Sequence, residues 1–271
     1  MTPRRSGRIG PDAPCILSID LACADWQGIG AALVGPEGAR IVVAPDRGRP
    51  TVEAMLRWIR QLVPAHGVTG ICIDGPLGWR APDGRAPHSR EAERAVRAPG
   101  KTGLPPDGVK PHTYLAFTRF SIALFEQLTM VDGWRLPGQT PDAAAVASTA
   151  PGFVTECFPT AIWRGLGLVP LKAKARATAD DVAAARARLE GATAVAIGGA
   201  GPAGLTHDQL QAVVGGVAAL RWVRGDPSAH LAGVPPQRLD GSWREGYILT
   251  LGPASDSVPS SPAAHVSVLP S

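Results

Sequence analysis

The sequence contains 271 residues, of which 27 are Lys or Arg and 23 are Asp or Glu, so its formal charge is +4. With 45% hydrophobic residues the chain is too apolar for a disordered protein, and its 32 glycines and 27 prolines argue against a long-helix protein. A chain of this length buries a sizeable core without needing a disulfide or a metal ion to stabilise it. No stretch of 18 uncharged apolar residues is present, which argues against a membrane protein.

The pattern of cysteines indicates in which kind of cellular compartment, reducing or oxidising, the protein is expected to reside. None of the four forms a CxxC pair, and Cys15, Cys72 and Cys157 each lie within an apolar run where a small hydrophobic side chain would pack. We therefore expect reduced core cysteines in a cytoplasmic protein rather than disulfides or a metal site.

The two ends differ in composition from the rest of the chain. Residues 1–14 are rich in Arg, Gly and Pro, and residues 253–271 are rich in Ser, Pro and Ala. Neither segment buries enough apolar surface to order itself, so both are expected to be disordered tails. No internal repeat is visible, and residues 15–252 are predicted to form one mixed α/β domain.

Three apolar runs open this domain. Residues 15–20, 27–34 and 39–44 are predicted strands, and the sequence GPEG supplies the turn between the last two, which is typical of a three-strand meander. Apolar residues recur at helical spacing over 52–63, and 69–74 is a short buried strand. A helix between two strands of one sheet implies a crossover connection.

The second half of the domain alternates helices with one further strand. The loop that follows its first helix is rich in Gly and Pro, and its length indicates function or disorder. The predicted elements are helices at 91–97 and 114–131, a strand at 153–158, and helices from about residue 160, at 179–190 and at 206–222.

The positive charge is concentrated in one segment. Residues 80–119 contain eight basic residues against four acidic ones, so the rest of the domain is slightly acidic. A basic segment attracts phosphates, although a run of charge is as often a solvated face.

Four acidic residues stand at the ends or starts of predicted elements: Asp20, Asp74, Glu156 and Asp208. Carboxylates that converge in one crevice repel each other unless a cation neutralises them, and a divalent metal does this well. Taken singly, Asp74 could begin a turn, Asp208 could cap a helix and Asp20 could be exposed. Caps and turns alone would not be expected to distribute four acids in this way.

The order of a meander, a helix, a strand and later acid-bearing elements resembles the RNase H-like fold, with a central mixed five-stranded sheet. More specific runs resemble the domain of unknown function 429 family, whose members are described as predicted RNase H-like nucleases. The resemblance covers most of residues 15–252, and the runs that carry it are SIDLACADW, GICIDGPLGWR, AERAVR, TECFPTAIWRGLGL and HDQLQAV.

The resemblance implies a divalent-metal-dependent nuclease or phosphodiesterase that acts on nucleic acid or another phosphate-containing substrate. Its Mg²⁺ or Mn²⁺ ions would be held by Asp20, Asp74, Glu156 and Asp208, and two such metals activate a water and stabilise the leaving oxygen. The implied substrate contacts are Arg94 and Arg97, Lys172 or Lys174, and a stacking Trp79. For these, a solvated surface or core packing is the alternative.

One position departs from the family pattern. The last helix of the family and of the related Holliday-junction resolvases resembles DxxDA, with two acids on one helical face, whereas this chain has Asp208 and Gln211. Gln211 offers a neutral oxygen but no charge. His207 could replace the missing ligand or could be an ordinary exposed residue.

Two alternatives to a nuclease remain. The chain could be a catalytically degenerate protein that binds nucleic acid or a nucleotide without turnover, as Gln211 suggests. It could also perform small-molecule phosphoryl chemistry, because sugar kinases share the core topology, but LACADW after Asp20 lacks the glycine turn that would bind a phosphate.

Overall fold

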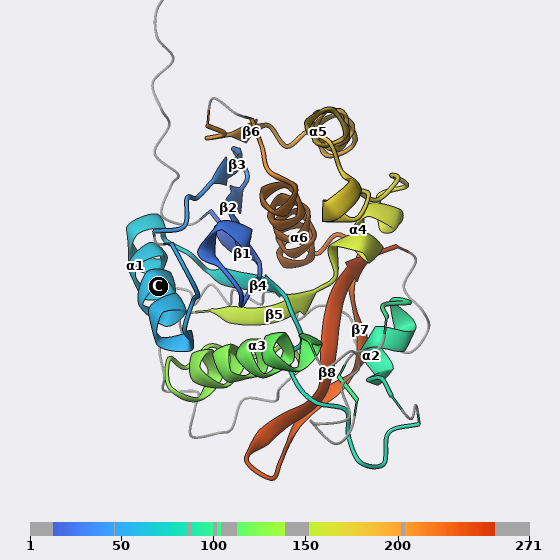
Figure 1. Cartoon of the computed structure of the whole chain (residues 1–271). Helices are drawn as coiled ribbons and strands as arrows, with labels where there is room; N and C mark the ends of the chain where they lie inside the picture. Colours follow the sequence, from blue (N-terminus) through green and yellow to red (C-terminus); the bar gives the residue numbers. More distant parts are fainter. Residues whose placement is uncertain are drawn as a thin grey trace, which may run out of the picture.

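The computed structural model describes residues 13–45, 47–85, 88–99, 102–103, 113–138, 152–201 and 204–252. The predicted tails at 1–14 and 253–271 lie outside this part of the chain, apart from Ala13 and Pro14. Within the described residues, the strands form a mixed sheet in the order β6-β3-β2-β1-β4-β5-β8-β7, with helices on both of its faces (Figure 1).

The centre of the sheet consists of β1 (Ile16–Asp20), β2 (Gly30–Gly35), β3 (Gly38–Ile41), β4 (Gly70–Asp74) and β5 (Phe153–Cys157). β2 runs antiparallel to β1 and β3, whereas β1, β4 and β5 are parallel neighbours. The predicted meander followed by parallel strands is therefore confirmed. Their burial on both faces explains why these strands read as continuous apolar runs.

The prediction of five strands was wrong, because the sheet contains eight. β6 (Ile197–Gly198) extends the meander edge, and β8 (Ser242–Leu251) adds to β5 and pairs with β7 (Ala229–Leu239). Asp240 and Gly241 join β7 to β8 with φ angles of 51° and 76°, as a two-residue hairpin turn requires. The register of β7 shifts between Val234 and Gln237, at two prolines that cannot donate ladder hydrogen bonds.

The helices agree with the predicted ones, and three of them begin at a threonine whose hydroxyl accepts a backbone hydrogen bond: Thr51, Thr178 and Thr206. The first residues of the predicted second strand instead form a short 3₁₀ turn. The elements are η1 (Trp26–Gly28), α1 (Val52–His66), α2 (Glu91–Ala95), α3 (Thr113–Met130), α4 (Pro159–Gly165), η4 (Lys174–Arg176), α5 (Ala179–Thr193) and α6 (His207–Val223).

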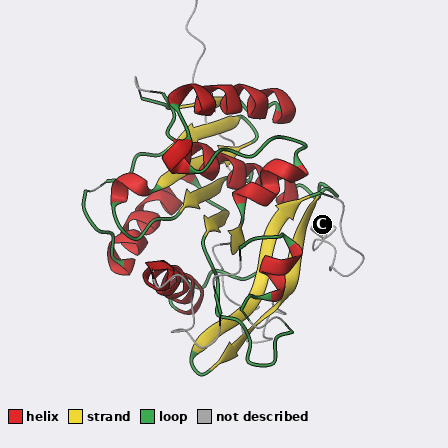
Figure 2. Cartoon of the chain, turned by 45° about the vertical axis from the view of Figure 1, so that its right-hand side comes forward, coloured by secondary structure: helices red, strands yellow, loops and turns green. Residues whose placement is uncertain are grey.

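Two apolar cores flank the sheet. One joins α4, α5 and α6 to one face, and the other joins α1 and α3 to the opposite face, an arrangement that Figures 1 and 2 show from two sides. α6 lies unusually close to the sheet, because Gly215 and Gly216 leave no room for a side chain against Ser18 and Val34. This close approach carries the first turn of α6 to the end of β1.

The cysteines follow the prediction for the core. Cys15, Cys72 and Cys157 are buried, Cys23 is half-buried, and all four are free thiols. The Sγ of Cys72 donates a hydrogen bond to the backbone carbonyl of Gly215, at 3.5 Å. Cys72 and Cys157 therefore pack between the sheet and α6 as small hydrophobic groups.

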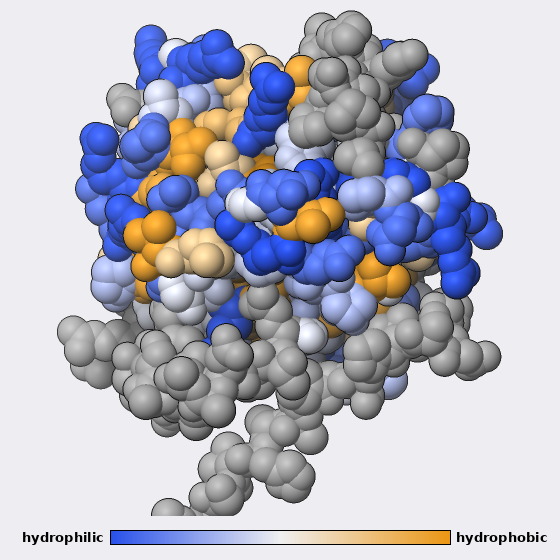
Figure 3. Space-filling view, turned by 90° about the horizontal axis from the view of Figure 1, so that it is seen from below, coloured by the Kyte–Doolittle hydropathy of each residue, from blue (hydrophilic) through white to orange (hydrophobic). Residues whose placement is uncertain are grey.

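The surface is mixed. On the face seen in Figure 3, apolar groups are separated by hydrophilic ones. Exposed large apolar side chains come from different parts of the chain: Val43 follows β3, Met130 ends α3 and Val169 follows α4. None of the helices in the described ranges has both the length and the apolar character that crossing a membrane requires.

Candidate active site

Asp20 and Asp74 are the last residues of two neighbouring parallel strands. They are paired in register across β1 and β4, so strand alternation places both side chains on the same face of the sheet. This is the face that α6 covers, because Cys72, two residues before Asp74, packs against α6. The structure therefore brings these two predicted acids together.

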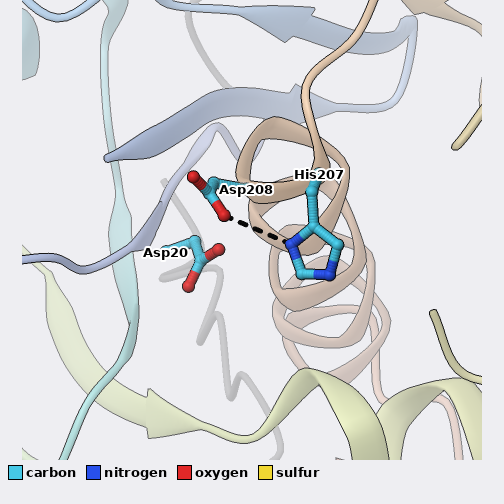
Figure 4. Close-up of side chains that lie close together, drawn as sticks. All are labelled: Asp20, His207 and Asp208. Atoms are coloured by element: carbon cyan, nitrogen blue, oxygen red, sulfur yellow. Dashed lines mark hydrogen bonds and ion pairs between the residues drawn. The ribbon is translucent and has the colours of Figure 1, made fainter. Parts of the chain in front are cut away.

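Asp208 joins them from the first turn of α6. One ligand atom each from Asp20, His207 and Asp208 lies within 4.8 Å of the others, and Figure 4 shows the two carboxylates facing each other beside the imidazole. Gly30, the register partner of Asp20 on β2, permits this approach. A Cβ atom at Gly30 would lie 2.0 Å from the backbone oxygen of Asp208, so only glycine lets α6 begin here.

The cluster is electrostatically unfavourable without a cation. Burial raises the pKa of Asp20 well above its usual value of 3.8, the negative charges of Asp74 and Asp208 raise it further, and the ammonium of Lys174 opposes the shift. Hydrogen bonding to Asp74 favours the protonated form of Asp20 and raises its pKa in the same direction. A proton thus provides the neutralisation that a metal ion would otherwise supply.

His207 is held in an orientation that favours a cation at its second nitrogen. Its Nε2 lies 3.1 Å from the backbone carbonyl oxygen of Lys172, which can only accept a hydrogen bond. Its Nδ1 lies 3.2 Å from Oδ1 of Asp208, another acceptor. In the tautomer that donates Nε2–H to this carbonyl, the lone pair of Nδ1 faces the side of the Asp208 carboxylate, where it can bind a metal cation. Metal-binding histidines are commonly oriented by such a carbonyl contact.

The two lysines after α4 have different positions. The ammonium of Lys174 forms an ion pair with Oδ2 of Asp208, whose side chain is 8% exposed. Lys174 therefore lies at the acid cluster. Lys172 instead donates to Asp181 at 2.8 Å on the surface and approaches the site only through its backbone carbonyl. Of the two lysines that the family resemblance suggested, the structure brings Lys174 to the acids.

Glu156 does not join the other acids. In the register of β4 and β5 it pairs with Ile73, whereas Asp74 pairs with Cys157, so alternation directs Glu156 to the opposite face. There it forms a two-pronged ion pair with the fully buried Arg90, at 2.6 and 2.8 Å. Burial raises the pKa of Glu156, and the guanidinium of Arg90 opposes that shift. The carboxylate also accepts the backbone N–H of Leu77 at 2.7 Å.

The side chain of Gln211 also has a hydrogen-bond partner outside the acid cluster. Its Oε1 accepts a hydrogen bond from Nε1 of Trp163 at 2.8 Å, and Trp163 is completely buried beneath α6. The glutamine therefore satisfies the one polar atom of a core tryptophan, a role that an acid of a metal site would not have.

The residues predicted to contact the substrate differ in their exposure to solvent. Arg94 and Arg97 are exposed at the end of α2, and Arg94 forms only a loose pair with Glu91 at 3.6 Å. Trp79 is 5% exposed and packs on Ile122, so its ring faces the core rather than solvent. The basic segment is likewise less exposed than its sequence indicates, because Arg80 and Arg90 are buried; Lys101 and Lys110 lie outside the described residues.

No family model matches the sequence, and no curated protein matches it. Among solved structures, a chain of "T. thermophilus RuvC in complex with Holliday junction substrate" matches with a TM-score of 0.39 and 9% sequence identity. The match covers 79% of this chain and 97% of that one. A superposition this loose, at an identity this low, does not indicate the chemistry of the present chain.

Proposed function

We propose that this chain is a divalent-metal-dependent nuclease or phosphodiesterase with an RNase H-like core. The observation that carries the proposal is the convergence of Asp20, Asp74 and Asp208 from β1, β4 and α6 at one edge of the sheet. The strand order β3-β2-β1-β4-β5, with β2 alone reversed, supports the RNase H-like assignment. Three carboxylates crowded together form the oxygen-rich donor set that Mg²⁺ and Mn²⁺ prefer.

In this proposal Asp20, Asp74 and Asp208 hold the metal, and Nδ1 of His207 is a further ligand. A bound Mg²⁺ or Mn²⁺ supplies the charge that lowers the pKa of a water and stabilises the leaving oxygen in phosphodiester hydrolysis. Lys174, which is exposed and beside Asp208, donates to a phosphate oxygen. Arg94 and Arg97 bind the phosphates that flank the cleaved bond. Glu156, locked to Arg90, positions the loop after β4 instead of binding metal.

The test is cleavage of labelled RNA, DNA, hybrid and branched substrates with Mg²⁺ or Mn²⁺ and with EDTA. We expect metal-dependent cleavage that falls by about 100-fold or more in Asp20→Asn, Asp74→Asn and Asp208→Asn, on the scale of losing a catalytic group. Glu37→Gln, in the exposed turn between β2 and β3, is the matched control and should cleave normally. Cleavage by none of these proteins, or equal cleavage by all, would contradict the proposal.

A second candidate is a nucleic-acid-binding protein that has lost turnover. The hydrogen bond between Gln211 and Trp163 favours it, because the position of the second acid in the last helix of the family pattern is used here for packing. This candidate predicts metal-independent binding of the same substrates with no cleavage by the wild-type protein.

A further inference from the structure

A cavity of about 100 Å³ opens beside the acid cluster, between α2, α3 and the ends of β4 and β5. Asp74 belongs to both the cluster and the cavity wall, and Glu156 and Glu93 line the cavity as well. Its apolar walls include the rings of Tyr114, Phe117 and Phe158. The cavity is therefore a mainly apolar recess, lined in part by aromatic rings, whose polar end adjoins the proposed catalytic acids.

One polar atom in this recess has no partner among the described residues. Thr118 of α3 is fully buried and lines the cavity, and its hydroxyl makes no hydrogen bond. A helical threonine ordinarily donates to the carbonyl four residues earlier, as Thr129 of the same helix does to Phe125 at 2.8 Å. The Thr118 hydroxyl thus remains available to a molecule in the cavity.

Two of the other polar groups in the lining, Glu93 and Glu156, are carboxyl groups that accept hydrogen bonds. Oε2 of Glu93 accepts the backbone N–H of Arg90 at 3.0 Å, but its Oε1 lies 3.7 Å from the guanidinium, beyond hydrogen-bond distance. Arg90 lies within ion-pair distance of both Glu93 and Glu156, so one guanidinium faces two carboxyl groups. The recess therefore favours a ring that carries an N–H donor over one that carries only carbonyl oxygens at that edge.

Size limits the ring. The recess, of about 100 Å³, is smaller than the closed cavity of about 150 Å³ that accommodates one benzene molecule, so it receives a six-membered ring only with part of that ring outside, and the two fused rings of a purine are too large for it. Aromatic walls are suited to a nucleobase face, since every base offers a π-surface for stacking. Among the bases, cytosine combines a single ring with an exocyclic amine, from which a carboxylate accepts a hydrogen bond.

We propose that this recess binds one unstacked cytosine base of the substrate, next to the phosphate that the acid cluster cleaves. The inference rests on the proposed function for the identity of the substrate as nucleic acid. The aromatic side chains would contact the inserted part of the ring. The Thr118 hydroxyl would donate a hydrogen bond to its O2 or N3, and Glu93 would accept one from its exocyclic amine. Because Asp74 lines both sites, the bound base and the cleaved phosphate belong to neighbouring nucleotides.

The experiment measures binding in EDTA, so that it does not depend on cleavage. The probes are fluorescent oligonucleotides of six residues, in which one central residue carries a base and the others are abasic. That base is cytosine, adenine, or thymine in the deoxyribose series and uracil in the ribose series. Fluorescence anisotropy should show at least about tenfold tighter binding of the cytosine oligonucleotide in one of the two series. Glu37→Gln, in the exposed turn between β2 and β3 and away from the recess, should retain this preference.

Two variants test the recess itself. Ala98→Phe places a ring inside it and should abolish the cytosine preference, and Thr118→Val, which keeps the shape but removes the hydroxyl, should reduce it. Ala116→Phe, on the exposed side of α3, is the matched control and should bind as the wild type does. Equal binding or no binding of the oligonucleotides by the wild type, or an unchanged preference in Ala98→Phe, would overturn the proposal. A cytosine preference without cleavage in metal would leave the recess standing and refute the nuclease.

Discussion

Asp20 is the residue at which stability and proposed function conflict. Its carboxyl lies against those of Asp74 and Asp208, and burial and both charges raise its pKa. Proteins hold such unfavourable groups together at functional sites, where a ligand later relieves the repulsion. The metal-free protein therefore depends on protonation of this cluster for part of its stability.

This dependence has a definite sign. The folded pKa of Asp20 lies above the unfolded value, so the stabilisation is complete below the usual value of 3.8 and is lost as the pH rises through the folded pKa. In EDTA, Asp20→Asn should be more stable than the wild type at pH 8, with about 2–4 °C in Tm for each kcal/mol gained. Its advantage should shrink towards pH 4 in thermal unfolding scans. A variant that is less stable at pH 8, or an advantage independent of pH, would contradict this.

Gln211 provides a second prediction. If the family pattern governed this site, Gln211→Asp would restore an acid and strengthen metal binding. The hydrogen bond from Trp163 indicates the opposite, because the shorter aspartate removes the acceptor of a buried N–H, at a cost of about 1–3 kcal/mol. We expect lower stability in urea unfolding and no gain in Mn²⁺ affinity by calorimetry. A tenfold or larger gain in affinity would show that the position is a ligand position after all.

At the scale of elements, the site depends on how closely α6 approaches β2. Gly30→Ala introduces a Cβ that would lie 2.0 Å from the Asp208 carbonyl, so the first turn of α6 must move. We expect a loss of about 1–3 kcal/mol in stability, typical of overpacking, and at least tenfold weaker Mn²⁺ binding. Gly191→Ala in α5, which meets nothing within 4 Å, is the control and should be as stable as the wild type or up to about 1 kcal/mol more stable. Unchanged Mn²⁺ binding in Gly30→Ala would refute this explanation of how α6 is placed.

The Glu156–Arg90 pair connects β5 to the segment around α2. Breaking a buried pair leaves an uncompensated charge, so Glu156→Gln should lower stability by on the order of 3 kcal/mol. Because Glu156 lies on the other face of the sheet from Asp20, the Mn²⁺ affinity should stay within about twofold of the wild-type value. Chemical unfolding and calorimetry measure the two effects separately. An affinity loss as large as that of Asp20→Asn would place Glu156 in the metal site.

At the scale of the whole molecule, local patterns in the sequence predict the elements that local interactions determine. Apolar runs and helical spacing located the five central strands and the helices, and the strand ends located Asp20 and Asp74. The hairpin of β7 and β8 was missed because two prolines and a bulge interrupt its alternation, although Asp240-Gly241 is a recognisable hairpin turn. The burial of Arg90 has no local signal, because only the fold pairs it with Glu156.

The same limit applies to the site. Side-chain direction at the end of a strand depends on register, so the sequence alone does not distinguish Glu156 from Asp74. The pairing of β4 with β5 places them on opposite faces. The sequence leaves His207 open as either a replacement ligand or an ordinary exposed residue, because its contacts with Asp208 and the Lys172 carbonyl require the close approach of α6. The net charge of +4 reveals neither the separation of Glu156 from Asp74 nor the contacts of His207.

The central claim, that Asp20, Asp74 and Asp208 hold a divalent cation, is tested most directly by crystals of the wild-type protein grown with Mn²⁺. Anomalous scattering identifies the ion and its ligands without reference to any substrate. We predict a Mn²⁺ peak bound by carboxylate oxygens of Asp20 and Asp208, with Asp74 or Nδ1 of His207 beside it. Saturating Mn²⁺ with no peak at this cluster, or a peak only at Glu156, would contradict the claim.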